Sequence, residues 1–326
     1  MNAALRLLLS LAIAVLLLAL LFLWGGASCA DLRGTLARLP AGTWFSALAI
    51  HAGIYLLRAA RFRVLIPPRH RPPLARVLGI SAAHNLAAYV LPAKTGEAAL
   101  VLYLKGACAV PAREGLATLV VSRLLDLATL AGGLGIACLA MRWLVPLGAL
   151  LLALAALFGL LCLRPAALVR VPTVLTRLAR LERTRAGARV EARAAEAAAA
   201  LSAAGGAGRL PAAALLSLPL WLGVFLFYAV LARGLGLSES VELARATFGS
   251  GLAVAANLLP INGLAGFGTQ EAGWVVGFGA LGVSRELALS SGLGAHLVQL
   301  ANVAAFGLLG HLAMGLARRR PAPRTS

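Results

Sequence analysis

The sequence predicts an all-α polytopic membrane protein in which six helices cross the bilayer and two further segments form broken, re-entrant helical hairpins. Composition is the first observation behind this fold class. Of the 326 residues, 61% are hydrophobic and 13% are charged, whereas soluble domains are near half apolar and about a quarter charged. A water-soluble fold of this length must cover a large surface with polar groups. We therefore expect lipid to surround most of this chain.

The second observation is a series of apolar runs of spanning length. A helix needs roughly 20 apolar residues to cross the hydrocarbon core of a bilayer. Six runs of this kind hold few or no charges: residues 7–24, 39–57, 115–141, 143–163, 210–232 and 287–317. The first run follows Arg6 and precedes a cluster of small residues, as a signal peptide does, but its length favours a retained span.

The third observation is the position of the arginines in a chain whose net charge is +19. Residues 58–76 contain six arginines and no acid, residues 164–209 contain nine against three glutamates, and residues 318–324 contain four. Such clusters beside spans mark the cytoplasmic side, so the charge needs no nucleic acid to explain it. With all three clusters in the cytoplasm, the six spans leave both termini on that side.

Two apolar stretches are predicted to be interrupted. Asparagine, proline, glycine and glutamate residues break residues 77–104 and residues 248–278, in the shared order Asn, Leu-Pro, Gly, Glu. Each half is too short to cross a bilayer alone. By the charge pattern, the first stretch enters and leaves on the cytoplasmic side and the second on the outer side. We therefore predict an inverted repeat, and in transporters of that design the substrate binds where the interrupted helices meet.

We predict a single polytopic membrane domain over residues 1–326, with two pseudo-repeats at about residues 43–163 and 210–317. Residues 164–209 join the repeats as a cytoplasmic linker. Within residues 172–201 of this linker, Val174, Leu178 and Leu181 fall on one helical face and several arginines lie off that face. This pattern predicts an amphipathic helix at the membrane surface.

Few ionisable residues lie inside the apolar segments, and those that do are functional candidates by default. Arg123 and Asp126 share one face of a span, where they either neutralise each other or receive a substrate. At the first interruption, Glu97 is expected to cap a helix N-terminus, and that N-terminus together with Lys94 would present donors to an anionic group. Glu271 is expected to cap a helix in the same way at the second interruption.

The candidate substrate-binding set follows from these positions. Asn85 and Asn257 stand at the two interruptions, where an amide either satisfies freed backbone groups or contacts the substrate. We predict a site made of Asn85, Lys94, Glu97, Arg123, Asp126, Asn257 and Glu271. His296, Gln299 and Asn302 share a face of the last span, which favours hydrogen bonds between helices over the lining of a cavity.

The sequence argues against a metal site and a cofactor. Its only aspartates are Asp31 and Asp126, and it contains no DxD, HExxH, GxSxG or Walker motif. The five histidines lie far apart in the sequence, and the four cysteines form no CxxC pair. We therefore predict no metal ligand set, no cofactor and no disulfide framework.

Four groups of residues resemble one known family. They are residues 58–63; Asn85 with Leu91-Pro92 and Gly96-Glu97; Arg123 with Asp126; and Asn257 with Pro260, Gly266 and Glu271. From about residue 40 to residue 317, the sequence is similar to the transmembrane domain of lysyl-phosphatidylglycerol synthase/flippase proteins. The resemblance implies a stand-alone, flippase-like, multi-pass protein of the bacterial inner (plasma) membrane. The sequence ends at Ser326 without the soluble domain of two-part members, so synthase activity is not implied.

We therefore expect a lipid translocase and not an enzyme. It would move an anionic or phosphate-bearing lipid between leaflets, with a membrane phospholipid or a polyprenyl-phosphate lipid as partner, and without nucleic acid or cofactor. A homo-oligomer is compatible with this expectation. One alternative is a membrane-embedded enzyme that acts on lipid-linked sugars or lipid headgroups, for which Glu97, Asp126 and Glu271 are the available bases. Another is a scaffold for lipid-synthesis or envelope machinery.

Overall fold

A computed structural model of the chain contains helices and no strand in the part that it describes. That part comprises residues 29–91, 96–142, 144–163, 183–204, 208–237, 242–258 and 264–319, with scattered positions within 15–23 and 170–180. The all-α fold class is therefore confirmed. Most of the first predicted span, residues 7–24, lies outside the described residues, and so do Lys94, Pro92 and Pro260.

The helices follow one another with short connections. The first are α2 (Cys29–Ala37), α3 (Ala41–Leu65), the 3-10 helix η1 (Pro68–His70), α4 (Leu74–Val90), α5 (Ala99–Cys108), α6 (Ala112–Ala140) and α7 (Val145–Leu163). The others are α9 (Arg185–Ala204), α10 (Arg209–Gly234), α11 (Leu243–Leu258), the 3-10 helix η3 (Leu264–Gly266), α12 (Thr269–Ala280) and α13 (Arg285–Arg319). Pro40, Pro73 and Pro111 directly precede α3, α4 and α6. A proline costs no hydrogen bond there, because the first N–H groups of a helix have no partner within it.

Three helices are long and apolar enough to cross a membrane: α6, α10 and the Arg285–Leu316 part of α13. A shorter apolar helix covers Val145–Leu161 of α7, and α3 is 25 residues long. These five helices coincide with the last five predicted spans. The largest difference is in α3, which continues to Leu65 and not to residue 57, so that Arg58 and Arg61 lie within the helix. That all six segments cross the bilayer stays a prediction.

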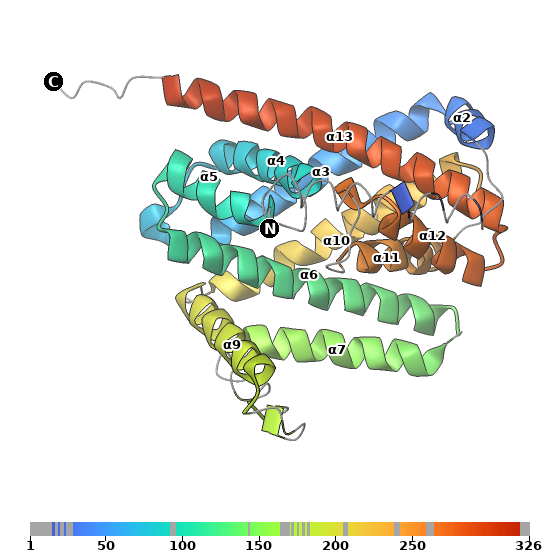
Figure 1. The fold of residues 1–326 in the computed structure, drawn as a ribbon. Coiled ribbons are helices and arrows are strands. Elements are labelled where there is room, and N and C mark those ends of the chain that lie inside the picture. Colours follow the sequence, from blue (N-terminus) through green and yellow to red (C-terminus); the bar gives the residue numbers. More distant parts are fainter. Residues whose placement is uncertain are drawn as a thin grey trace.

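Helix ends interrupt both of the segments that were expected to be broken. α4 stops at Val90 and α5 begins at Ala99, while α11 stops at Leu258 and α12 begins at Thr269. α4 packs against α5, and α11 packs against α12. In Figure 1 the first pair lies toward the left end of the bundle and the second pair toward the right end. This arrangement fits the predicted inverted repeat, which itself stays a prediction.

The segments that carry the arginine clusters meet at one end of the bundle. α3 ends, α6 begins and α13 ends on the left of Figure 1. Arg209 Nη1, at the start of α10, donates to the Leu65 carbonyl oxygen at 3.3 Å. Arg69 Nη2 and His70 Nδ1 of η1 contact the Glu114 carboxylate, near the start of α6, at 2.9 and 2.8 Å. The positive-inside pattern predicts that this end faces the cytoplasm, and this orientation stays a prediction.

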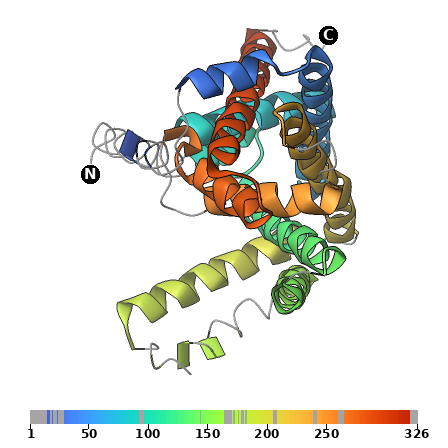
Figure 2. The ribbon, with the colours of Figure 1, turned by 90° about the vertical axis from the view of Figure 1, so that its right-hand side faces the viewer.

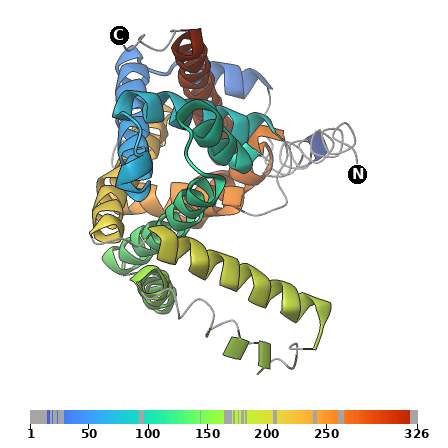
Figure 3. The ribbon, with the colours of Figure 1, turned by 90° about the vertical axis from the view of Figure 1, so that its left-hand side faces the viewer.

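The main apolar core lies between α3, α6, α10, α11, α12 and α13. The strongest helix pairings around it are α3 with α10, α4 with α13 and α6 with α7. Figures 2 and 3 view the molecule along the bundle from its two ends and show α9 extending away from the bundle. α9 lies against α6 and covers residues 185–201 of the predicted amphipathic linker helix, whereas Leu178 and Leu181 of the predicted apolar face lie outside the described residues.

The pairing of α11 with α12 depends on glycines at the contact. A Cβ added to Gly277 would lie 2.4 Å from the Gly249 carbonyl oxygen and 2.8 Å from its Cα. Because both obstacles are backbone atoms, Gly277→Ala is expected to destabilise the protein by about 1–3 kcal/mol, as overpacking of a core does. The measurement is thermal unfolding in detergent.

Gly279 of the same helix is the matched control, since an added Cβ there meets nothing within 4 Å. Gly279→Ala should leave the unfolding midpoint unchanged or raise it slightly, because alanine favours helix more than glycine does. Equal midpoints for the Gly277 and Gly279 variants would contradict the close packing of α11 on α12.

Candidate functional site

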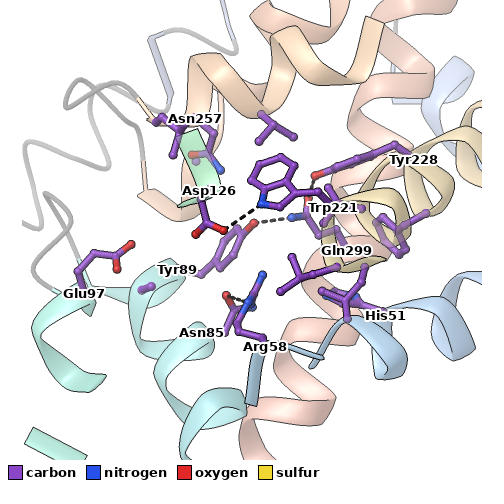
Figure 4. Close-up of a pocket in the computed structure, with 18 of the residues that line it drawn as sticks. His51, Arg58, Asn85, Tyr89, Glu97, Asp126, Trp221, Tyr228, Asn257 and Gln299 are labelled. Atoms are coloured by element: carbon purple, nitrogen blue, oxygen red, sulfur yellow. Dashed lines mark hydrogen bonds between the residues drawn. The ribbon is translucent and has the colours of Figure 1, made fainter. Parts of the chain in front are cut away.

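A polar cavity lies in the middle of the bundle, between the two interrupted helix pairs. It encloses about 180 Å³ and is lined by side chains from α3, α4, α6, α10, α11 and α13 and by the backbone turn of η3. Five of the seven residues predicted from the sequence line it: Asn85, Glu97, Arg123, Asp126 and Asn257. Figure 4 shows Asn85, Glu97, Asp126 and Asn257 facing the same space from different segments of the chain. The structure thus brings together residues that lie in opposite halves of the chain.

A buried ion pair joins α3, α6 and α10 at this cavity. Arg61, with 1% of its side chain exposed, donates to Asp126 Oδ1 at 2.8 Å and to Ser217 Oγ at 3.0 Å. The indole Nε1 of Trp221 donates to the same Asp126 oxygen at 2.9 Å. The Asp126 carboxylate therefore accepts from two helices at once and holds them in register.

Arg123 connects this ion pair to the first interruption. Its Nη1 contacts Asp126 Oδ2 at 3.1 Å, and its Nη2 contacts Glu97 Oε2 at 2.6 Å. Glu97 lies just before α5, so this bridge ties the interrupted segment to α6. The sequence left open whether Arg123 and Asp126 neutralise each other or meet a substrate. They are paired, yet 41% of the Arg123 side chain is exposed.

Arg58 is a cation of the cavity wall, although its position in the sequence predicted a place in a cytoplasmic arginine cluster. Its Nη1 donates to Asn85 Oδ1 at 3.0 Å, and Asn85 Nδ2 donates to the hydroxyl of Tyr55 at 2.7 Å. The guanidinium lies 5.7 Å from the centre of the Tyr55 ring. Within the described part of the chain, no carboxylate pairs with Arg58. The Asp126 carboxylate attracts Arg58 from a distance, but it is already paired with Arg61 and Arg123.

The spacing of residues in α3 indicates that Arg58 faces the interior of the bundle. His51, Ile54 and Arg58 recur at helical spacing and all line the cavity, and Arg61 follows three residues later. Residues three and four apart share a helix face, so a helix extended to residue 65 would have placed both arginines inward. The inward position of Tyr89 could be read in the same way from Asn85, four residues before it.

Gln299 of α13 organises the other side of the cavity. Its Oε1 accepts from Gln270 Nε2 at 2.7 Å and from the Tyr228 hydroxyl at 3.0 Å, and its Nε2 donates to the Tyr89 hydroxyl. Asn257 Nδ2 donates to Gln270 Oε1 at 3.4 Å. Gln299 thus makes the hydrogen bonds between helices that the sequence favoured, and it also lines the cavity.

Glu271 lies behind the cavity wall and not in its lining. It is fully buried, accepts from the Gly268 backbone N–H at 2.7 Å, and contacts His296 Nδ1. His296 Nε2 in turn meets the carbonyl oxygen of Ala265 at 3.1 Å, and Ala265 lines the cavity. Glu271 therefore caps α12 as expected, and its link to the cavity runs through His296 and the backbone.

The charges of the wall suit an anion more than they suit acid–base chemistry. Three guanidinium groups, those of Arg58 and Arg123 in the lining and that of the buried Arg61, stand around two carboxylates, those of Glu97 and Asp126. Arginine binds phosphate through charge-assisted and often bidentate hydrogen bonds. Among the residues that the structure describes, no cluster of His, Cys, Asp and Glu could hold a metal ion.

Comparison with known protein families agrees with the resemblance read from the sequence. The family model described as "Lysylphosphatidylglycerol synthase TM region" matches residues 7–307. The chain belongs to this family. The match covers nearly the whole sequence and includes the first apolar run. No curated protein and no solved structure matches the chain. The family is a lipid-related membrane domain, which agrees with a multi-pass membrane protein.

Proposed function

We propose that this member of the lysylphosphatidylglycerol synthase TM family is a lipid translocase of the bacterial inner membrane. It would move an anionic or phosphate-bearing lipid between the leaflets. The observation that carries this proposal is Arg58, a guanidinium in a central polar cavity that forms no direct ion pair with a carboxylate among the described residues. The basic end of the bundle would face the cytoplasm, with both termini on that side.

The charge at Arg58 makes an anionic ligand favourable. A cation at membrane depth costs several kcal/mol unless it is paired. A phosphate group in the cavity would pair with Arg58, and Asn85, which now accepts from Arg58, would be free to turn its amide toward the ligand. Arg123, already neutralised by Glu97 and Asp126, would add donors without adding net charge.

The two interrupted helix pairs supply the moving parts of the proposed mechanism. In transporters with such pairs, one gate opens toward each side of the membrane around a fixed site. Glu97 attaches the first pair to the cavity through Arg123, and Gln270 attaches the second pair through Gln299. A headgroup that contacts both helix pairs would therefore respond to the position of each pair and would shift the equilibrium between their positions.

An enzymatic role for the same residues is less well supported. The alternative of an enzyme acting on lipid headgroups needs a carboxylate free to take a proton. Asp126 is held by Arg61 and Trp221, and Glu97 is held by Arg123. Glu271 is engaged by His296 and the Gly268 N–H. These arrangements favour binding over catalysis.

The test is leaflet exchange of labelled lipids in vesicles that contain the purified protein. Arg58→Gln should slow the exchange of an anionic lipid about tenfold or more, because a hydrogen bond to a charged group contributes about 1.5–3 kcal/mol. Arg113→Gln is the matched control, since Arg113 is exposed at the start of α6. No exchange above empty vesicles for anionic, zwitterionic and polyprenyl-phosphate lipids would contradict the proposal.

A further inference from the structure

A second cavity, apolar in its lining, lies between α6, α10 and α11. Its volume is about 490 Å³. Small residues of α6, including Ala128, Gly132 and Gly133, form one wall, and Leu218 and Leu222 of α10 form the rim. These two leucines are 60% and 49% exposed on the outer surface of the bundle. This second cavity is therefore a groove that opens sideways, toward the lipid that surrounds a membrane-embedded bundle.

The groove offers almost nothing to a polar ligand. Of its two threonines, Thr129 turns its hydroxyl to the Leu125 carbonyl oxygen at 2.7 Å, and Thr247 is buried. No charged side chain is among its described lining residues. Cavities with such walls stay dry and take up hydrocarbon.

Trp221 is the residue that the two cavities share. It lines the polar cavity and the apolar groove, and it is 7% exposed. Its indole N–H points to Asp126 at 2.9 Å on the polar side, while its ring lies 5.7 Å from that of Phe225 in the groove wall. The polar and apolar sites therefore meet at Trp221, an amphipathic side chain, and this suits a ligand that is polar at one end and apolar at the other.

We propose that the groove binds one hydrocarbon chain of the lipid whose headgroup occupies the polar cavity, with Trp221 dividing the two sites. This inference rests on the proposed function and narrows its substrate class to lipids. The polar lining of the first cavity suits a headgroup, whereas a hydrocarbon chain needs the apolar surroundings that the groove offers. The groove begins on the other side of Trp221 and opens to the bilayer, so a chain can follow it without crossing a polar wall.

The test uses a photoreactive anionic phospholipid whose cross-linking group is in the acyl chain, with the whole purified protein in vesicles. Mass spectrometry should find cross-links on the facing residues of α6, α10 and α11. Ala244→Phe, which fills the groove from α11, should lower this labelling about tenfold, within the range that misfit costs in an apolar pocket. Ala149→Phe on the exposed face of α7 is the matched control and should leave the labelling unchanged.

A second arm leaves the groove intact, so it does not depend on the folding of the Ala244 variant. Arg58→Gln should lower groove labelling by the anionic lipid and leave labelling by a zwitterionic lipid unchanged, because headgroup and chain belong to one molecule. Equal labelling of wild type and Arg58→Gln would mean that bulk bilayer lipid fills the groove, and would overturn the inference. A protection experiment with a guanidinium-modifying reagent gives a further outcome. If glycerol phosphate protects Arg58 to the same extent as the lipid does, the inference is likewise overturned.

The two proposals fail in different ways. Leaflet exchange without groove labelling would remove the chain site and leave the translocase. Groove labelling that depends on Arg58, with no leaflet exchange, would remove the translocase and leave a lipid site that spans Trp221.

Discussion

Asp126→Asn is expected to lower the free energy of unfolding by about 3–5 kcal/mol, the usual cost of removing one partner from a buried ion pair. Arg61, 1% exposed, would keep its charge and lose its carboxylate. Burial leaves little water to replace that carboxylate, and Trp221 and Arg123 would each exchange a charged acceptor for a neutral one. Thermal or denaturant unfolding in detergent measures the loss.

A double replacement separates the buried charge from the shape of the site. Arg61→Met combined with Asp126→Leu should recover most of the stability, because an apolar pair of similar volume is often as stable as a buried ion pair. Glu286→Gln, at an exposed position in α13, should leave the unfolding midpoint unchanged. If Asp126→Asn unfolds like the wild type, then water in the cavity solvates Arg61 and the pair does not hold α3 against α6.

Glu271→Ala is expected to have the second largest effect, on both stability and the shape of the cavity wall. It removes the acceptor of the Gly268 N–H and the partner of His296, and hydrogen bonds to a charged group contribute about 1.5–3 kcal/mol each. His296 also holds the carbonyl of Ala265, whose φ is 56°. A left-handed conformation costs a non-glycine residue about 1–2 kcal/mol, so the turn should relax once His296 is released.

Hydrogen exchange gives the direct reading of that change. Amides of residues 264–269 should exchange faster in Glu271→Ala than in the wild type, while those in the middle of α6 should not change. Glu286→Ala is the matched control for removal of an exposed carboxylate. Unaltered exchange in residues 264–269 would mean that the turn is held by packing and not by Glu271 and His296.

Much of the site could be predicted because interruptions within apolar segments are visible in sequence. Polar residues at Asn85, Glu97 and Asn257 stand out where the surroundings are apolar, and each of these residues lines the cavity. Arg123 and Asp126 stand out for the same reason. Family membership followed from the same residues and is confirmed by the family model.

The position of Arg58 and Arg61 was not predicted, for a physical reason. Arginine is also the residue that marks the cytoplasmic ends of spans, so a cluster that begins at the end of an apolar run gives no sign that its first members face inward. The partner of Arg61 is Asp126, 65 residues away in sequence. Trp221, 95 residues from the same carboxylate, stood in an apolar run as one more apolar residue.

The sequence by itself determined the membrane environment of this protein, its helical class, its family and the two places where its helices break. These properties depend on hydropathy, charge and helix-breaking residues, all of which act locally along the chain. Only the tertiary structure decided that Asp126 pairs with Arg61, that Arg58 has no carboxylate partner among the described residues, and that Trp221 stands between a polar and an apolar cavity. Those outcomes depend on which helix faces meet, and burial makes charges there matter only in relation to neighbours from distant parts of the chain.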